Sequence, residues 1–215
     1  FDLDWFWDET KYIELLKISG GLNRIIHYRD KIQSDLTTEH CSEIQSKKRT
    51  YYKELVQSGG IKVRDGVLRL IKELADCNIE QFIVTTSGKE SLDPFLHTTL
   101  YSHLKFFTQI ITYEDVINHK PFPDAYNLAK KLCKKSNNNC IVIEDSIIGV
   151  DAAKAANLKC LMTLPPWATS FKKINKKADA CVDSLGNSEN HSRIVFGKPL
   201  INNIVDLAYL TQIIN

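Results

Sequence analysis

Three short stretches of the chain combine residue types that could hold a phosphate group and transfer it. Thr85-Thr86-Ser87-Gly88 offers hydroxyls and backbone N–H groups suited to an anion. Glu144-Asp145-Ser146 offers two adjacent carboxylates, which suit a hard cation such as Mg²⁺. Between them in sequence, His119-Lys120-Pro121-Phe122-Pro123-Asp124 presents one lysine in a proline-rich loop. Together they supply an anion cradle, a fixed positive charge and a cation anchor, the set that phosphoryl transfer requires.

Each stretch also has a purely structural interpretation. Thr and Ser directly after a strand are often helix caps. Glu144 and Asp145 could cap the helix that follows them, and a single lysine in a proline loop is usually solvated. The combination of the three at strand ends of one sheet favours chemistry over capping.

The pattern after residue 65 indicates the elements that position these stretches. Apolar, β-branched runs at 82–86, 110–112, 140–143 and 160–164 alternate with helical patterns at 67–75, 91–100, 123–133 and 147–156. Near-continuous apolar strands between helices predict a parallel sheet covered on both faces. In such sheets ligands bind beyond the carboxyl ends of the strands, which is where Thr85 and Glu144 fall.

The chain before this region reads as helices only. Helical patterns begin near Asp8, continue through Ile25 to Ile32 and through 38–55, and end at Ser58-Gly59-Gly60. We therefore expect a helical cap domain over residues 1–62 and an α/β domain over 63–215. The predicted fold class is α/β, a Rossmann-like doubly wound parallel sheet with a small all-helical cap.

Two sequence motifs carry a resemblance to a known superfamily. Lys120-Pro121-Phe122-Pro123-Asp124-Ala125-Tyr126 matches K-P-x-P-D-x-Y, and the stretch from Glu144 through Gly149 to Ala156 matches E-D-S-x-x-G-x-x-A-A-x-A-A. With Thr85 ending a strand, the chain resembles the haloacid dehalogenase-like phosphohydrolases. The resemblance implies a phospho-aspartate intermediate that water hydrolyses, with Thr85 and Lys120 as catalytic residues. It further implies Mg²⁺ held by Asp145 and Glu144, and substrate contacts from Thr86, Ser87 and Ser146.

The helical part of the sequence narrows the resemblance to one branch of this superfamily. Leu3-Asp4-Trp5-x-Trp7-Asp8, followed by Tyr12, Gly20-Gly21 and Arg24, is similar to the cap of the CbbY-type phosphatases, relatives of β-phosphoglucomutase. Known members of that family remove the 1-phosphate of xylulose 1,5-bisphosphate, an inhibitor of Rubisco. The resemblance implies that Arg24, Gly20 and Gly21 hold the distal phosphate, a role that suits a guanidinium. Taken alone, Arg24 would be interpreted as a surface residue on a helix.

Two other functions stay open at this point. A phosphomutase of the same fold would isomerise a sugar phosphate and release no phosphate. A non-catalytic fragment would bind a phosphorylated ligand without turning it over.

The first residues imitate a catalytic motif. Phe1-Asp2-Leu3-Asp4 spells hydrophobic-Asp-x-Asp, but Trp5-Phe6 follows where the motif needs Gly-Thr to turn the chain. We therefore expect that Asp2 is not the nucleophile, and that the nucleophile and general-acid Asp pair are absent together with the first, central strand. Its loss would leave two half-sheets with unpaired inner edges. We interpret the sequence as an incomplete record or a clipped product.

Composition excludes several other classes. With 28 basic and 26 acidic residues among 215, the net charge of +2 does not indicate a nucleic-acid-binding surface. The six cysteines form no C-x-x-C pair, so we expect reduced thiols rather than disulfides or a zinc site. No apolar run is long enough for a membrane span. The expected partner is a small phosphorylated sugar, with no nucleic acid and no membrane. We expect a monomer in a bacterial or cyanobacterial cytoplasm or in the plastid stroma.

Overall fold

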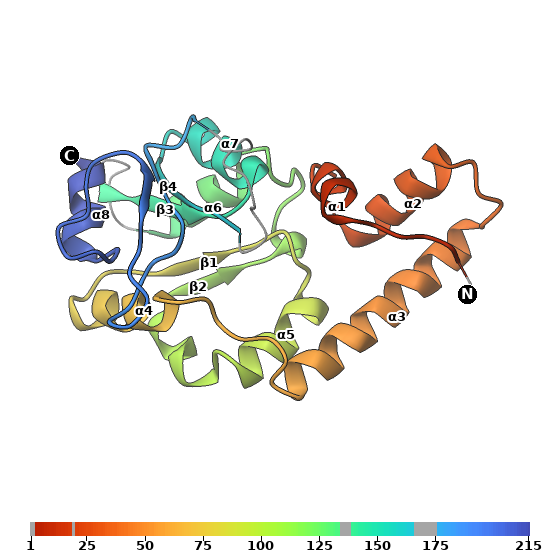
Figure 1. The fold of residues 1–215 in the computed structure, drawn as a ribbon, viewed down its shortest axis with the longest axis horizontal. Coiled ribbons are helices and arrows are strands. Elements are labelled where there is room, and N and C mark those ends of the chain that lie inside the picture. Colours follow the sequence, from red (N-terminus) through yellow and green to blue (C-terminus); the bar gives the residue numbers. More distant parts are fainter. Residues whose placement is uncertain (1–2, 19, 134–138, 166–175) are drawn as a thin grey trace. The chain divides into compact units, whose positions relative to one another are not determined.

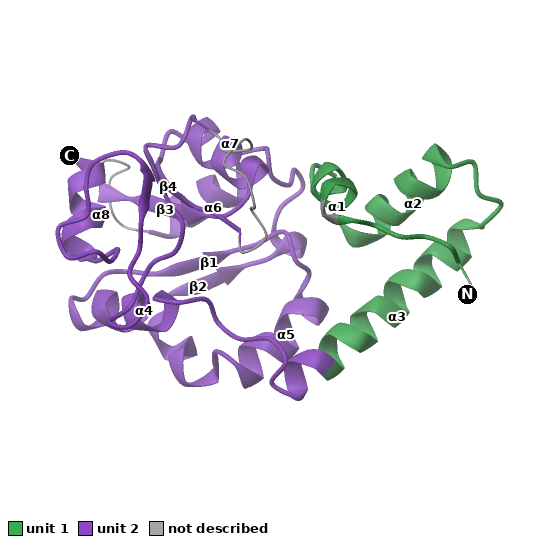
Figure 2. Cartoon of the chain, in the orientation of Figure 1, with its two compact units in different colours: residues 1–54 green, residues 55–215 purple. Residues whose placement is uncertain are grey.

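The computed structural model describes residues 3–18, 20–133, 139–165 and 176–215. The chain divides into two compact units, residues 1–54 and 55–215, coloured separately in Figure 2. We refer to them as the helical unit and the α/β unit. The division falls within helix α3 (Thr38–Gln57). The predicted boundary after residue 62 follows the end of that helix, and it stays a prediction.

The helical unit is built from α1, α2 and α3, with bounds Glu9–Leu15, Gly21–Lys31 and Thr38–Gln57. The Asp8 carboxylate caps α1 by accepting from the Lys11 N–H at 2.7 Å. The bounds agree with the helices expected from the sequence pattern. The side chains buried in this unit are Leu15, Ile25, Tyr28 and Cys41.

The segment before α1 contributes to this small core. Trp5 and Trp7 pack edge-on against Tyr28, with ring centroids 5.2 and 5.3 Å apart. Asp4 is exposed, and Asp2 lies outside the described residues. The segment therefore packs through its aromatic residues, as expected for the entrance to a helical domain.

The α/β unit alternates strands and helices along the chain (Figure 1). Its elements are α4 (Val67–Asp76), β1 (Phe82–Val84), α5 (Lys89–Thr98), the 3-10 helix η1 (Tyr101–Phe106), β2 (Gln109–Ile111), η2 (Tyr113–Asp115), α6 (Asp124–Leu132), β3 (Ile141–Glu144), α7 (Ile147–Ala155), β4 (Lys159–Thr163), β5 (Ala180–Val182), β6 (Ile194–Phe196) and α8 (Leu207–Ile214).

The strands form two separate sheets. β1 pairs with β2, and a second sheet has the order β3-β4-β5-β6. All pairs are parallel except β5 with β6, which is antiparallel. The predicted division between the strand that ends at Thr85 and the strand that ends at Asp145 is thus confirmed. The explanation offered for it, a missing central strand, stays a prediction.

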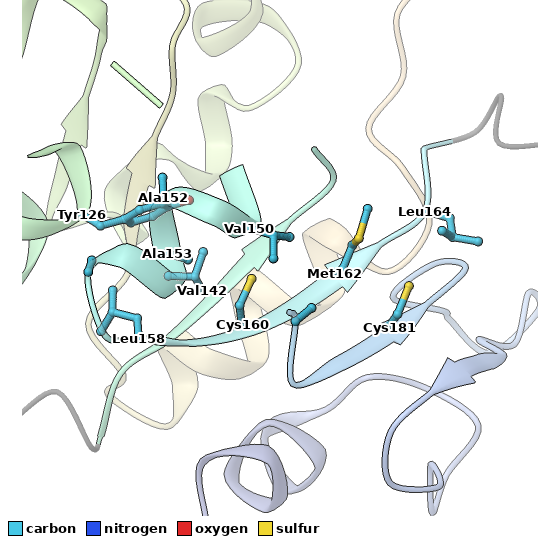
Figure 3. Close-up of a cluster of buried hydrophobic side chains, with 12 residues drawn as sticks. Tyr126, Val142, Val150, Ala152, Ala153, Leu158, Cys160, Met162, Leu164 and Cys181 are labelled. Atoms are coloured by element: carbon cyan, nitrogen blue, oxygen red, sulfur yellow. The ribbon is translucent and has the colours of Figure 1, made fainter. Parts of the chain in front are cut away.

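Side chains of alternate residues cover both faces of the sheets. On β4, Cys160 and Met162 pack with α7, whereas Leu161 packs with α4 and α8 on the other face (Figure 3 shows the first cluster). The β1–β2 sheet lies between α6 on one face and α4, α5 and η1 on the other. The architecture is the expected parallel sheet with helices on both faces, which brings the carboxyl ends of β1 and β3 to one edge.

Two strands were not predicted from the sequence. Among the described residues no helix lies between β4, β5 and β6, so these two strands lack the strand–helix alternation that marked β1 to β4. The Arg64 guanidinium helps to hold this end of the sheet, donating to Thr163 Oγ1 at 3.2 Å, to the Asp183 carbonyl at 3.1 Å and to the Leu164 carbonyl. Within the described residues, no helix is both long and apolar enough to cross a membrane.

Candidate active site

Lys120 lies at the carboxyl edge, with its ammonium group between the two sheets. The residue is 6% exposed. Its Nζ donates to the carbonyl of Val84, the last residue of β1, at 2.9 Å, and to Glu144 Oε1, at the end of β3, at 2.5 Å. One nitrogen therefore joins the ends of two strands that do not pair with each other.

The Glu144 carboxylate is held on both oxygens. Besides Lys120, Oε1 accepts from the hydroxyl of Tyr126 on α6, and Oε2 accepts from Ser146 Oγ at 3.2 Å. Burial and the Glu144 charge raise the pKa of Tyr126 well above its ordinary value, so the phenol stays protonated and acts as the donor. Gly149 leaves the space for this arrangement, because a Cβ there would overlap the carboxylate.

Asp145 differs from its neighbour, because the residue as a whole is exposed to solvent, although protein atoms surround much of its carboxyl group. Loss of hydration and the Glu144 charge raise the pKa of Asp145, while the Arg64 and Lys120 charges oppose that shift. This placement leaves Asp145 the more accessible of the two predicted metal ligands.

The donor set fits Mg²⁺ in its chemistry, since that ion commonly takes one or two carboxylates and keeps several waters. In the part of the chain that the structure describes, no group of three or more His, Cys, Asp or Glu residues could hold a metal. A metal role for Asp145 and Glu144 remains a prediction.

Thr85, Thr86 and Ser87 follow β1 directly and lead into α5. The Ser87 N–H donates to Thr85 Oγ1 at 3.0 Å, and the Thr85 N–H donates to the Ile111 carbonyl of β2 at 2.9 Å. Thr85 and Thr86 are half-buried and Ser87 is exposed. The loop is at the same strand end as the Val84 carbonyl that holds Lys120, so the structure brings Thr85 to the predicted edge. Its catalytic role stays a prediction.

Ser146 was predicted to bind substrate, and its hydroxyl has two contacts within the protein. It caps α7 by accepting from the Gly149 N–H at 3.0 Å, and it donates to Glu144. The structural interpretation, a helix cap, therefore holds for Ser146. A substrate contact from the same side chain stays a prediction.

Arg24, Gly20 and Gly21 lie in the helical unit, at the start of α2. Gly20 is the N-cap residue, with φ of 86°, and as a glycine it supplies no side-chain acceptor for the first N–H groups of the helix. Lys48 on α3 lies near Arg24: loss of hydration lowers its pKa, and the Arg24 charge lowers it further. Sequence reasoning missed Lys48, because nothing in a helical pattern shows which residue faces Arg24.

The structure thus gathers Lys120, Glu144, Asp145, Ser146 and the Thr85 loop at one edge of the α/β unit. Tyr126, Gly149 and Arg64 also belong to this edge and were not assigned a role from sequence. The K-P-x-P-D-x-Y motif contained the signal for Tyr126, which ends it.

Comparison with known proteins agrees with this geometry. The family model for haloacid dehalogenase-like hydrolases matches residues 13–163. The plasmid-encoded protein CbbY of Cupriavidus necator is 31% identical over 167 residues, which cover 75% of this chain and 66% of that protein. Protein CbbY of Cereibacter sphaeroides is 28% identical, over 85% of this chain and 79% of the relative. The chain thus spans about two thirds to four fifths of the length of these relatives.

Solved structures give the same result. CbbY from Rhodobacter sphaeroides in complex with phosphate is 28% identical, with a TM-score of 0.75 over 84% of this chain and 80% of that one. A variant of the same protein in complex with xylulose-(1,5)bisphosphate has a TM-score of 0.72 over the same shares. β-Phosphoglucomutase from Clostridium difficile, at 22% identity and a TM-score of 0.69, shares the fold over 96% of this chain and 82% of its own. The family match, the CbbY relatives and the fold all agree, and the chain belongs to the haloacid dehalogenase-like hydrolase family.

Proposed function

We propose that this chain is the larger part of a sugar-phosphate phosphatase whose substrate is a pentulose bisphosphate, xylulose 1,5-bisphosphate. The observation that carries the proposal is the buried ammonium group of Lys120, held between Val84 and Glu144 beside the Thr85 loop. The similarity to a CbbY protein solved with xylulose-(1,5)bisphosphate supports the choice of substrate.

Lys120 supplies a positive charge to the phosphoryl group. An ammonium has three N–H donors, and Lys120 directs two of them to Val84 and Glu144. The remaining N–H is free to bond a phosphoryl oxygen. Because the protein contacts fix the ammonium before the substrate arrives, little reorganisation is needed when charge develops in the transition state.

The loop after β1 completes the cradle for the same group. Thr85 and Thr86 offer hydroxyls for an anion, whereas the Lys89 N–H at the start of α5 already donates to the exposed Glu114 carboxylate at 3.1 Å. Asp145, with Glu144, would hold Mg²⁺, which when bound neutralises charge on the phosphoryl oxygens. In this proposal an aspartate that these 215 residues do not supply attacks phosphorus and the sugar alcohol leaves; water then cleaves the phospho-aspartate, which releases phosphate and restores the carboxylate.

The distal phosphate is held by the helical unit in this proposal. Arg24 and Lys48 provide two positive charges, and the start of α2 at Gly20-Gly21 provides backbone N–H groups.

The test is phosphate release from xylulose 1,5-bisphosphate by a full-length form that carries an N-terminal Asp-x-Asp-Gly-Thr segment. We expect Mg²⁺-dependent release that Lys120→Ala lowers by about 10²–10³-fold, the cost of one lost oxyanion donor. Lys72→Ala is the matched control, since Lys72 is an exposed lysine of α4 that pairs only with Asp76.

Other outcomes of this assay would assign the protein to another functional class. The proposal would be overturned if no phosphate were released, or if Lys120→Ala left the rate of phosphate release unchanged. Isomerisation of a sugar phosphate without net release would indicate a phosphomutase. Binding of the bisphosphate without any turnover would indicate a non-catalytic binding protein.

The expectation of a monomer in a bacterial cytoplasm or plastid stroma also stays a prediction. Relatives in bacteria and in Arabidopsis thaliana, where a CBBY-like protein is 28% identical over 86% of this chain and 60% of its own length, support the proposed location and leave the monomer untested.

A further inference from the structure

At the carboxyl edge, Tyr126 makes polar contacts in addition to the packing contacts of its ring. It lies in the first turn of α6 and is 5% exposed. Its ring packs in the core cluster with Val150 and Ala152 of α7 (Figure 3). Its hydroxyl, in contrast, points to polar atoms and donates to Glu144 Oε1.

The same side chain contacts Lys120 in a second way. The Lys120 Nζ lies 4.8 Å from the centroid of the Tyr126 ring, within the range of a cation–π contact. Tyr126 and Lys120 therefore share one acceptor, Glu144 Oε1, and also face each other directly. The ammonium is bounded by a carbonyl, a carboxylate oxygen and an aromatic ring.

The Glu144 carboxylate can rotate in only a few ways in this environment. Ser146 holds Oε2, and a Cβ at Gly149 would overlap the group, so the helix start packs tightly against it. The Tyr126 hydroxyl provides the bond that keeps Oε1 turned toward Lys120 when the lysine itself moves. Without that bond, Lys120 would be the only donor that fixes Oε1.

We propose that Tyr126 is a positioning residue: its hydroxyl fixes the Glu144 carboxylate, and the carboxylate and ring together aim the third N–H of Lys120 at the phosphoryl group. The catalytic part of this inference rests on the proposed phosphatase function. The positioning part concerns only this chain and is measurable without substrate.

The direct test uses ¹⁵N-labelled lysine and the ammonium signal of Lys120, assigned by its absence in Lys120→Arg. In Tyr126→Phe the ring and its packing remain and the hydroxyl is lost. We expect the Lys120 ammonium protons to exchange with water about fivefold faster, the effect of one typical hydrogen bond. In a Glu144→Gln background, adding Tyr126→Phe should change this exchange rate much less, because the two residues act as one unit.

Tyr209→Phe is the matched control. Tyr209 is 1% exposed, lies on α8, and donates to the Lys198 carbonyl at 3.0 Å, away from Lys120. Both substitutions remove one hydrogen-bonded phenol hydroxyl from the core and should lower the melting temperature by a similar amount. Only Tyr126→Phe should change the Lys120 signal. An unchanged Lys120 signal in Tyr126→Phe would overturn the inference and leave Tyr126 with a packing role.

Kinetics on the full-length protein separate this inference from the proposed function. We expect Tyr126→Phe to lower kcat about tenfold with KM nearly unchanged, as for a small misplacement of a catalytic group. A wild-type protein without phosphatase activity, whose Lys120 signal still responds to Tyr126→Phe, would refute the function and support the positioning role. An active protein in which Tyr126→Phe changes neither kcat nor the Lys120 signal would refute the positioning role but not the proposed function.

Discussion

We propose a phosphate contact both for Lys120 in the α/β unit and for Arg24 and Lys48 in the helical unit, but the surroundings of these cations differ. Lys120 is buried and paired with a carboxylate. Arg24 and Lys48 lie beside another positive charge, and among the described side chains neither pairs with a carboxylate. The charge of Lys120 is balanced by a carboxylate of the protein, whereas we propose that a ligand balances the charges of Arg24 and Lys48.

This difference corresponds to two kinds of task. A group that meets a reacting phosphoryl needs fixed geometry, and burial beside a counter-charge provides it at a cost in desolvation. A group that holds a spectator phosphate needs charge more than fixed geometry, so cations near a helix start are sufficient. Four predictions test this contrast.

The largest effect is expected where the buried pair is broken. Lys120→Met leaves the Glu144 charge buried without its cation, so we expect the free energy of unfolding to fall by about 3–5 kcal/mol. Urea denaturation of the chain measures it. Lys72→Met, which breaks the exposed Lys72–Asp76 pair, should cost less than about 1 kcal/mol. Equal losses in the two variants would contradict the contrast.

Next in size is the effect of the helical cations on substrate binding. We expect Arg24→Gln or Lys48→Gln to raise KM for the bisphosphate of the full-length enzyme by about 10–100-fold, the loss of one charged contact to a phosphate. A pentulose 1-phosphate, which lacks the distal phosphate, should show almost no change. Steady-state kinetics on both substrates measures this. A similar rise in KM for both substrates would place the two cations elsewhere than at the distal phosphate.

A smaller effect is expected from crowding the Glu144 carboxylate. Gly149→Ala places a Cβ where the carboxylate lies, and we expect a loss of about 1–3 kcal/mol in unfolding free energy, typical of overpacking. Gly88→Ala is the matched control, because the atom it would meet is the end of the exposed Glu114 side chain, which can move away. Thermal or urea unfolding of both variants tests whether the tight contact is specific to Glu144.

The smallest effect concerns acid stability. Burial raises the pKa of Asp179, but hydrogen bonds from Lys154 and the Cys160 N–H, with the Lys154 and Lys159 charges, bring the net shift to a lower pKa. A carboxyl whose folded pKa is lowered stabilises the protein above its ordinary pKa, and the effect is lost as pH falls through the folded pKa.

Asp179→Asn should therefore destabilise the protein by about 1 kcal/mol at neutral pH. The difference from wild type should begin to shrink as pH falls below the ordinary Asp pKa of about 3.9 and disappear only below the lowered folded pKa of Asp179. Glu14→Gln in the helical unit, where the partner Lys31 and Glu14 are both exposed, serves as the comparison and should change stability little at any pH. Unfolding followed from neutral pH downward measures both. A difference that persists in acid would mean that Asp179 acts through packing.

Much of the fold was predictable because its signals are local. Helix patterns located α2 and α3 within a few residues, and β-branched runs located β1 to β4. The strands β5 and β6 follow β4 with no described helix between them, so they lie outside the alternation that marked the other strands, and the sheet adds them because neighbouring strands offer hydrogen-bond partners. The divided sheet was expected from the resemblance, and the two strand orders agree with it.

The features of the candidate site also divide into those that the sequence predicted and those that only the structure revealed. The sequence alone determined which residues could do chemistry, because Lys120, Glu144 and Asp145 belong to motifs with fixed spacing. Only the tertiary structure decided that Lys120 and Tyr126 share one oxygen of Glu144, that Asp145 is exposed, and that Lys48 lies near Arg24. These contacts join residues far apart in the chain, and they depend on how α6 and α7 pack against the strands and how α2 packs against α3. The spacing of residues along the chain carries no information on such packing. The sequence therefore identified the residues that could do chemistry, and the fold determined their contacts.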